Sequence, residues 1–520
     1  MNIDELPDDP KELKKILLDF QQHISFLEKK MLIFQKSLFG SSSEKNKQFE
    51  KDQRILPFLK NTVASEDNNQ EEEVTVQVHK RRKKKGRRKL SPDIPRIEQI
   101  IDIPEEQKIC ECGAQLTRIG EDVSEKLDYV PAIIRIIRII RPKYACRKCE
   151  GVEDSSGAVK IARPPEQLIP KGVATSGLMA HIVISKFADG LPFYRQHLQF
   201  LRLGAEIPRS TMAAWAISVA EQCKPLVDLL IQDIRSGPLI NMDETPLQVL
   251  KEPGKKNTTK SYMWIFRGGD LQRPSVVFQY DPSRSKEVPT RFVGPDYRGY
   301  IQTDGYVGYD ELGSREGIVH LGCLVHARRK FFEVIKPLKK KKGAKIKAST
   351  AQTVLNHIRD LYRLENLAKE QGMSPEQIRD LRQEKAVPIL NKIKILLDER
   401  ISTTPPKSLL YKAISYALGQ WDRLVLYTED GILRPDNNLT ENAIRPLAVG
   451  RKNWLFAGSP NGARASAIYF SLIETAKANG LEPYAYIRHL FEMLPAAHTK
   501  EDLQKLLPKN FTRETLPAYS

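Results

Sequence analysis

The chain is poor in cysteine and has no long uncharged apolar run. Six cysteines in 520 residues are too few for the disulfide scaffold of a small secreted protein. The best candidate for a membrane span, residues 133–140, is short and contains Arg135 and Arg138, whereas a span needs about 20 apolar residues. Acidic residues such as Asp4 and Glu5 open the chain, so we expect no secretory signal. These absences favour a soluble intracellular protein.

Basic residues are in clear excess. The 83 lysines and arginines exceed the 65 acidic residues and give a formal net charge of +18. An apolar share of 40% is enough to fill sizeable cores and excludes wholesale disorder. At about 150 residues a domain, the length predicts about three or four domains. The excess positive charge favours nucleic acid as a partner, although a solvated basic surface without a partner would have the same net charge.

Apolar residues recur at alternating intervals of four and three positions near the start of the chain. This spacing forms an a/d seam of nearly four heptads and predicts a leucine-zipper-like coiled coil over residues 8–40. We expect the chain to self-associate through it; the alternative is an amphipathic helix packed on its own domain. The seam residues are Leu13, Leu17, Phe20, Ile24, Leu27, Met31, Phe34 and Leu38.

Residues 41–98 form a polar linker that contains a strongly basic run. Nine of the ten residues from Lys80 to Lys89 are basic, and such a run repels itself and does not fold alone. We expect it to lie along DNA phosphates, which gives affinity without sequence specificity; the alternative is a solvated linker. The predicted phosphate contacts are Lys80, Arg81, Arg82, Lys83, Lys84, Lys85, Arg87 and Arg88.

Two close pairs of cysteines follow the basic run, separated by 33 residues. Two such pairs suit a structural zinc site, because each supplies two thiolates to one tetrahedral ion. We therefore predict a zinc-ribbon-like DNA-binding domain over residues 99–160. The first pair is Cys-x-Cys rather than Cys-x-x-Cys, and four reduced cysteines without metal are the alternative. The predicted zinc ligands are Cys110, Cys112, Cys146 and Cys149.

Residues 165–235 are mainly helical in pattern. Within them we expect a helix over Met212–Cys223 with Ser210 as its N-cap. Short helices joined by a turn before an amphipathic helix are typical of a helix-turn-helix, whose second helix reads the DNA major groove. We predict a helix-turn-helix-like DNA-binding domain, although any small helical bundle would show the same pattern.

Two aspartates lie in or just after apolar runs that are typical of strands. Asp243 is central in residues 238–250, and Asp304 follows the apolar stretch that begins at Gly299. Two strand-like runs lie between them, and a fifth strand is expected over residues 317–321. This is the order of a ribonuclease H-like sheet, in which the first and fourth strands are neighbours. Asp243 and Asp304 would then face each other.

A glutamate from a later helix would complete this cluster. Glu441 lies in a polar segment, residues 436–446, where we expect a helix to begin. Gathered carboxylates hold Mg²⁺, and two ions roughly 3.5–4 Å apart can activate an attacking oxygen and stabilise a leaving one. The predicted cofactor is a pair of Mg²⁺ ions, or Mn²⁺ in their place.

The residues around these carboxylates resemble the insertion-sequence sixty-six family of bacterial transposases, and the resemblance covers nearly the whole chain. No single motif is specific, but together they are. The motifs are Met242–Pro246 (MDETP), Gln302–Tyr306 (QTDGY), Gly322–Phe331 (GCLVHARRKF), Asp436–Pro446 (DNNLTENAIRP) and Gly450–Ser459 (GRKNWLFAGS).

The resemblance implies a DDE-type DNA transposase in which Asp243, Asp304 and Glu441 form the metal-binding triad. Such an enzyme binds the ends of its insertion sequence, cleaves phosphodiester bonds and transfers the strand to target DNA, assisted by accessory proteins of the same element. A bacterial, cytoplasmic, nucleoid-associated location is implied. Relatives often carry arginine where this chain has Asn442. The alternatives are a non-catalytic DNA-binding regulator, which would need no acidic triad, and a nuclease for RNA–DNA hybrids.

The distance between Asp304 and Glu441 predicts an α-helical insertion, residues 323–430, between two parts of the core, residues 236–322 and 431–480. A C-terminal tail, residues 481–520, would follow. Cys323 and His326 could bind zinc with His320 as a third ligand, but we expect them to pack and hydrogen-bond near the active site. The phosphate contacts expected here are Arg328, Arg329, Lys330, Arg445, Arg451 and Lys452.

Overall fold

The computed structural model describes residues 134–145, 159–162, 164–170, 172–336 and 349–517. The expected coiled coil, the basic run and the four expected zinc ligands lie outside the described residues and remain predictions. Within the described part, no helix combines the length and the apolar character needed to cross a membrane.

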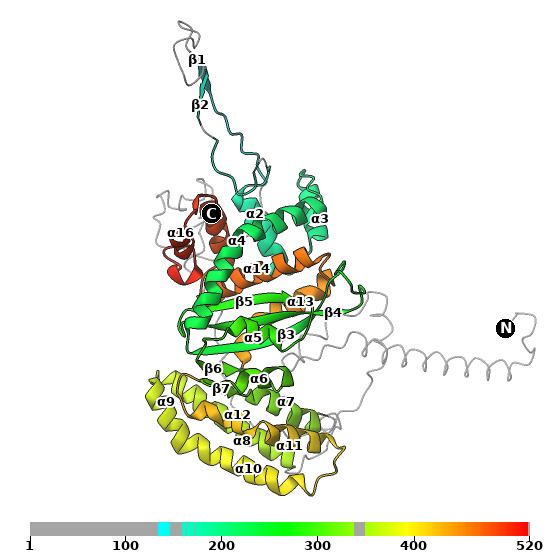
Figure 1. The fold of residues 1–520 in the computed structure, drawn as a ribbon, viewed down its shortest axis with the longest axis vertical. Coiled ribbons are helices and arrows are strands. Elements are labelled where there is room, and N and C mark those ends of the chain that lie inside the picture. The colour runs from blue at the N-terminus through cyan, green and yellow to red at the C-terminus, as the bar shows by residue number, and fades with distance from the viewer. Residues whose placement is uncertain (1–133, 146–158, 163, 171, 337–348, 518–520) are drawn as a thin grey trace, which may run out of the picture. The chain divides into compact units, whose positions relative to one another are not determined.

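A five-stranded mixed sheet organises the middle of the described chain (Figure 1). Its order is β5-β4-β3-β6-β7, with β3, β4 and β5 antiparallel and with β6 and β7 parallel to β3. The predicted pairing of the strand that carries Asp243 with the strand before Asp304 is confirmed. The strands are β3 (Leu239–Gln248), β4 (Lys260–Gly269), β5 (Pro274–Asp281), β6 (Gly299–Gln302) and β7 (Ile318–Leu321), besides a separate ribbon of β1 (Lys143–Ala145) and β2 (Val159–Ile161).

Both faces of the sheet are covered. Trp264, Ile265 and Phe266 are consecutive in β4 and all fully buried. Trp264 meets Tyr309 edge-on, and Phe266 stacks on Phe292 with ring centroids 3.5 Å apart. Ile265 faces the opposite side because side chains alternate along a strand. The short helices on the Trp264 side are α5 (Glu287–Val293), η4 (Val307–Tyr309) and α6 (Asp310–Gly313).

The free edge of β5 is closed by side chains of helix α14 (Pro460–Ala478). The backbone N–H of Phe278 donates to the Ser471 hydroxyl at 2.8 Å, and that of Val276 donates to the Thr475 hydroxyl at 2.9 Å. An unpaired strand edge invites pairing with other chains. Here the two hydroxyls accept hydrogen bonds from the backbone N–H groups of this edge within the same chain.

Three helices precede the sheet in the segment predicted to be mainly helical, and the third is longer than expected. It begins at Arg209 after Pro208 and continues through Pro225, so Ser210 lies inside the first turn and caps nothing. Residues beyond Pro225 stay helical because their apolar face, including Leu226 and Leu230, is fully buried and this burial outweighs the lost backbone hydrogen bond. The helices are α2 (Ser176–Phe187), α3 (Phe193–Arg202) and α4 (Arg209–Ser236).

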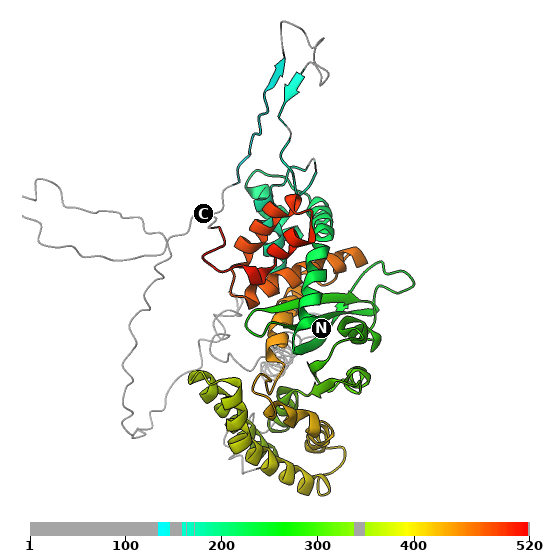
Figure 2. The same ribbon diagram turned by 60° about the vertical axis from the view of Figure 1, so that its left-hand side comes forward.

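A second hydrophobic cluster forms between helices that follow β7. Figure 2 shows these yellow-green helices as a layer apart from the orange and red helices near the other end of the sheet. The buried Arg382 binds Glu365 through two hydrogen bonds and donates to the carbonyls of Tyr427, Asp430 and Leu433, which fixes the layer internally. Its elements are α7 (Leu324–Ile335), α8 (Thr350–Glu370), α9 (Pro375–Leu381), η6 (Arg382–Ala386), α10 (Val387–Ile401), α11 (Leu409–Gly419), α12 (Trp421–Val425) and η7 (Leu426–Thr428).

The C-terminal segment expected as a tail folds back onto the first core. Tyr486, Leu490 and Phe491 are fully buried in the cluster that also contains the sheet, so this segment contributes to the core's stability. The remaining elements are α13 (Asn438–Trp454), α15 (Pro483–Met493), η8 (Leu494–Ala496), α16 (Lys500–Lys505) and η9 (Pro508–Asn510).

Candidate active site at the end of the sheet

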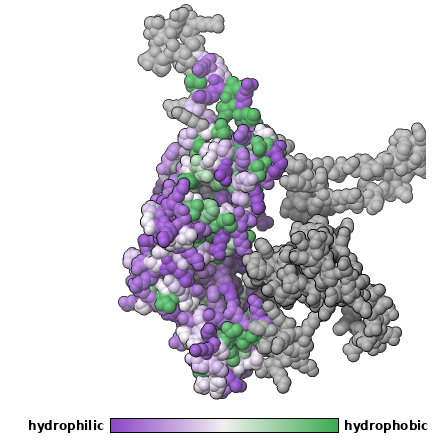
Figure 3. All heavy atoms as spheres, turned by 90° about the vertical axis from the view of Figure 1, so that its right-hand side faces the viewer, coloured by the Kyte–Doolittle hydropathy of each residue, from purple (hydrophilic) through white to green (hydrophobic). Residues whose placement is uncertain are grey.

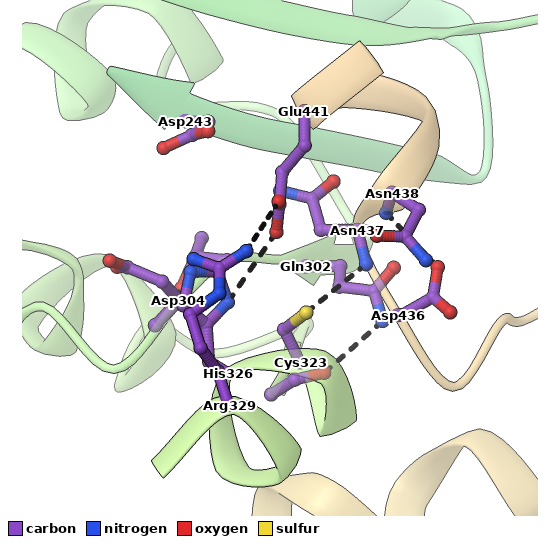
Figure 4. A network of polar contacts seen from close by, with 12 residues as sticks. Asp243, Gln302, Asp304, Cys323, His326, Arg329, Asp436, Asn437, Asn438 and Glu441 are labelled. Carbon is purple, nitrogen blue, oxygen red and sulfur yellow. Dashed lines mark hydrogen bonds and ion pairs between the residues drawn. The ribbon is translucent and has the colours of Figure 1, made fainter. Parts of the chain in front are cut away.

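The register of two parallel strands sets the positions of the two predicted aspartates. Asn241 lies opposite Gln302 in the β3–β6 pair, and its amide donates to the Gln302 side-chain oxygen at 2.8 Å. Both aspartates lie two residues further along their chains, so continuing this register places Asp243 opposite Asp304. The structure brings them to the same end of the sheet (Figure 4).

Glu441 reaches this end of the sheet from the first turn of α13. Asn437, just before the helix, fixes where α13 begins. Its side-chain amide donates to the Met242 carbonyl at 2.8 Å, and its backbone N–H donates to Cys323 Sγ at 3.3 Å. Glu441 therefore lies on a helix anchored to the residue next to Asp243 and to the residue before α7 (Figure 4).

The negative charge of the Asp243 carboxylate has little compensation from hydrogen-bond donors or cations. Its only hydrogen-bond donor within the described residues is the backbone N–H of Glu244, at 2.8 Å. Burial, together with the negative charges of Glu244, Asp304 and Glu441, raises the pKa of Asp243 to about 8. A carboxyl with a strongly raised pKa in a cluster of other acids is a candidate functional group.

Glu441 turns toward α7 rather than toward the aspartates (Figure 4). Arg329 donates to Glu441 Oε2 at 3.1 Å, and His326 Nδ1 lies 3.7 Å from Glu441 Oε1. Burial lowers the pKa of His326, although the Glu441 charge acts in the opposite direction. Glu441 is thus held by basic groups on one side of the site.

Only one group of three metal-ligating side chains is close-set among the described residues. The ligand atoms of Cys323, His326 and Glu441 all lie within 4.8 Å of one another. His320 is not part of this group, and its Nε2 lies 2.8 Å from the Thr303 hydroxyl instead. The three carboxylates are near one another but would need Glu441 to turn before they could share an ion.

Sequence reasoning missed the groups that surround Glu244. Its side chain is 3% exposed and pairs with Arg284, whose Nε donates to Oε1 at 2.7 Å, while the Tyr309 hydroxyl donates to Oε2. The guanidinium of Arg284 also lies over the Tyr306 ring, 3.7 Å from its centroid. The Tyr306 backbone N–H donates to Asp304 Oδ1 at 2.9 Å. This Glu244 network therefore connects to the loop that carries Asp304.

The expected phosphate contacts divide into outward and inward groups. Arg329, Lys330, Arg445 and Lys452 are exposed and Arg328 is half-buried, all on α7 or α13. Arg451 points inward instead, donating to the Thr245 hydroxyl at 2.8 Å and to the Pro246 carbonyl. In the view of Figure 3, hydrophilic residues are widespread on the described surface, with hydrophobic patches among them.

Comparison with known proteins places these features in one family. Residues 171–465 match the Transposase IS66 family, and residues 471–508 match the IS66 C-terminal element. Residues 107–150, which contain all four predicted zinc ligands, match the zinc-finger binding domain of transposase IS66. Residues 27–98 match a family described as Transposase C of IS166 homeodomain.

Two relatives are similar in sequence to nearly the whole chain. Uncharacterized protein y4jD of Sinorhizobium fredii is 33% identical over 98% of this chain and 97% of its own length. Uncharacterized protein y4qI of the same organism is 31% identical over 97% of this chain and 92% of its own length. Since one family match alone spans more than half of the sequence, the chain belongs to the IS66 family of transposases.

Proposed function

We propose that this chain is a DDE-type DNA transposase that binds the ends of its insertion sequence, cleaves phosphodiester bonds with divalent metal and transfers the strand to target DNA. One observation carries the proposal. The β3–β6 register and the Asn437 anchor gather Asp243, Asp304 and Glu441 at one end of the sheet. A regulator that only binds DNA would gain nothing from carboxylates, because they repel phosphates.

The strand order β5-β4-β3-β6-β7 supports a ribonuclease H-like core. In this proposal residues 236–322 and 431–480 form the core, and the helices of residues 323–430 are an insertion with its own hydrophobic cluster. Residues 165–235 act as a helix-turn-helix-like domain and residues 99–160 as a zinc ribbon, both for DNA binding.

Asp243, Asp304 and Glu441 would hold two Mg²⁺ ions, or Mn²⁺. The donor set fits, because carboxylate oxygens are the hard ligands that these ions prefer. Glu441 Oε1 is buried without a hydrogen-bond partner among the described residues, and Asp243 accepts one backbone hydrogen bond, so both keep lone pairs for a cation. Bound ions supply an activated oxygen nucleophile and stabilise the leaving oxygen.

The chain's own residues position the DNA for this reaction. Exposed basic groups on α7 and α13, including Arg329, Lys330, Arg445 and Lys452, would bind backbone phosphates beside the carboxylates, with Arg328 near them and the basic run at Lys80–Lys89 contributing affinity. Arg451 instead supports β3. Self-association through the coiled coil and accessory proteins of the same element complete the proposed assembly.

The triad is tested by neutralising each carboxylate at constant shape. Asp243→Asn, Asp304→Asn and Glu441→Gln should each lower Mg²⁺-dependent nicking of labelled end DNA by more than about 100-fold, which is the upper range for residues that only support a metal ligand. DNA binding measured in Ca²⁺ should persist. Asp296→Asn, at an exposed aspartate, is the matched control and should keep full activity. Full nicking by Glu441→Gln would remove the third carboxylate from the proposal, and parallel loss of binding and nicking in all three variants would indicate a structural role.

The zinc ribbon is tested by metal content. The purified full-length chain should contain about one zinc ion, because a Cys₄ set binds one ion. Cys146→Ser should release it, whereas Cys223→Ala, at a buried free cysteine of α4, should not. A wild-type chain purified without chelator and free of zinc would contradict the assignment.

A further inference from the structure

Cys323, His326 and Glu441 form a close-set group whose chemistry differs from that of the three carboxylates. Their ligand atoms all lie within 4.8 Å of one another, and His326 Nδ1 is 3.7 Å from Glu441 Oε1. Ligand atoms around one tetrahedral zinc ion lie roughly 3.3–3.7 Å apart, because zinc–ligand bonds are about 2.0–2.3 Å long. The group therefore comes close to the spacing that a single zinc ion requires.

Two helices hold this group in place (Figure 4). Cys323 immediately precedes α7 and His326 lies in the first turn of that helix, where its backbone N–H donates to the Cys323 carbonyl at 3.2 Å. Glu441 comes from the first turn of α13. The backbone N–H of Asn437, just before α13, donates to Cys323 Sγ at 3.3 Å. The backbone of the two helix starts thus fixes the group.

Two of the three ligand atoms lack a hydrogen-bond partner among the described residues. His326 Nδ1 and Glu441 Oε1 are both buried and unpaired in this way. Such atoms are rare in folded proteins, and a bound ion is one explanation for them. Arg329 binds the other oxygen of Glu441, Oε2, so an ion on Oε1 leaves that contact in place. The Asn437 N–H bond to Cys323 can persist when the sulfur binds a metal.

The donor set selects zinc over the ions of the proposed reaction. A thiolate and an imidazole are ligands that zinc prefers, whereas Mg²⁺ and Mn²⁺ prefer oxygen. One cysteine, one histidine and one carboxylate leave the fourth tetrahedral position to a water molecule. The Cys323 thiol releases its proton to solvent when the sulfur binds the ion.

Glu441 belongs both to this group and to the proposed triad. In the structure its side chain turns toward α7 rather than toward Asp243 and Asp304 (Figure 4). An ion shared with Cys323 and His326 stabilises this orientation, whereas an ion shared with the aspartates requires the other one. The two orientations exclude each other, so an ion bound in one lowers the population of the other.

We propose that Cys323, His326 and Glu441 bind one zinc ion, and that this zinc inhibits DNA cleavage by keeping Glu441 away from the triad. The inhibition rests on the proposed function, whereas the zinc site does not. Zinc at ten times its dissociation constant lowers the fraction of chains with a free Glu441 about tenfold. By reciprocity, Mn²⁺ in the triad weakens zinc binding by the same factor as zinc weakens Mn²⁺ binding.

The site is tested by metal analysis of the full-length chain after dialysis against a zinc buffer without Mg²⁺. The wild-type chain should hold about one zinc ion more than Cys323→Ser or His326→Gln. Zinc in the predicted cysteine ribbon cancels in this difference. His326 is only half-buried, so His326→Gln decides the matter if Cys323→Ser fails to fold.

Two matched controls should keep the full zinc content. Cys223→Ala removes a buried cysteine of α4 outside the group, and Asp243→Asn removes a carboxylate of the triad alone. Zinc lost from Asp243→Asn but kept by His326→Gln would place the ion in the triad and overturn the proposed site. Equal zinc contents in the wild-type chain, Cys323→Ser and His326→Gln would overturn it as well.

The inhibition is tested by Mg²⁺-dependent nicking of labelled end DNA with and without added zinc. Zinc at ten times its dissociation constant should lower the wild-type rate about tenfold, and His326→Gln should nick at the same rate with and without it. Equal inhibition of the two chains would overturn the effect on cleavage and leave the proposed function intact. A wild-type chain that does not nick even without zinc would contradict the proposed function, and the zinc contents would still decide the site.

Discussion

Two neighbouring acids on β3 have opposite surroundings. Glu244 is almost fully buried but pairs with Arg284 and accepts a hydrogen bond from Tyr309. Asp243 accepts one backbone hydrogen bond, and its pKa is raised to about 8 by burial and by three other acids. Glu244 therefore has a guanidinium and a hydroxyl donor beside it. Asp243, the acid proposed to bind metal, has only a backbone donor among the described residues.

Of these two adjacent residues, we expect Glu244 to contribute to stability and Asp243 to function. A buried charge with partners costs stability when one partner is removed, whereas a buried charge without partners is already unfavourable. Conflicts between local chemistry and stability concentrate at functional sites. The comparison therefore predicts which substitutions lower the free energy of unfolding and which would lower activity while the fold is kept.

The largest stability effect is expected for Glu244→Gln. It leaves Arg284 and Tyr309 without a charged acceptor, and because Arg284 is partly exposed we expect a loss of about 2 kcal/mol in the free energy of unfolding. Chemical denaturation at pH 7 measures it. Glu311→Gln is the matched control, since its pair with Lys286 is more than half exposed on both sides and its loss should change the free energy of unfolding far less. An equal loss in the free energy of unfolding in the two variants would contradict the stabilising role inferred for Glu244.

A smaller effect is expected for Arg329→Gln. Arg329 pairs with Glu441 at 3.1 Å and would compete with an ion at the proposed metal site, so its removal should strengthen Mn²⁺ binding by roughly two- to fivefold, the equivalent of an exposed ion pair. Titration calorimetry measures this affinity. Lys330→Gln removes the next cation on α7, which lies 4.6 Å from the centre of the Tyr416 ring rather than on Glu441, and should leave the affinity unchanged. Weaker Mn²⁺ binding by Arg329→Gln would show that Arg329 supports the metal site.

A third effect, which depends on pH, extends the comparison to a base. Lys186 has three aromatic rings around its ammonium, Phe187, Phe193 and Trp454, at 4.7 to 5.6 Å from the ring centres, and burial lowers its pKa to about 8. Between pH 8 and 10 the unfolded chain binds this proton more tightly than the folded chain, so the free energy of unfolding should rise with pH.

Lys186→Met should flatten that rise in urea unfolding measured at pH 8, 9 and 10. Lys224→Met, at an exposed position of α4, should keep the wild-type slope. A slope that is the same with and without Lys186 would mean that the rings stabilise the ammonium enough to cancel its burial.

The strands and the two aspartates could be predicted because their signals are local. Apolar runs ending at a polar residue or glycine mark β3 and β6, and their pairing follows from strand order. Glu441 could be named from the family motif. Its turn toward Arg329 and His326 could not, because α7 lies more than 100 residues earlier and no local pattern encodes the contact. The same applies to Arg284, which reaches Glu244 from 40 residues away.

The extension of α4 was missed for another reason. Pro225 is a local signal to end a helix, and burial of the residues after it overrides that signal. Ser210 was likewise a reasonable cap by composition, but Pro208 fixes the start of the helix two residues earlier. Tertiary burial decides both cases, and it is visible only when the rest of the core is in place.

The Asn437 anchor has a consequence for the order of events on the ribosome. Its bonds join residues 195 and 114 positions apart in the sequence, so they cannot form until Asn437 has left the exit tunnel. Domains fold during synthesis from the N-terminus, and contacts this distant form slowly. Helices α2 and α4 share one buried cluster with α14 and α15, which are synthesised later still, so neither the first core nor the acidic cluster is complete until most of the chain has been made.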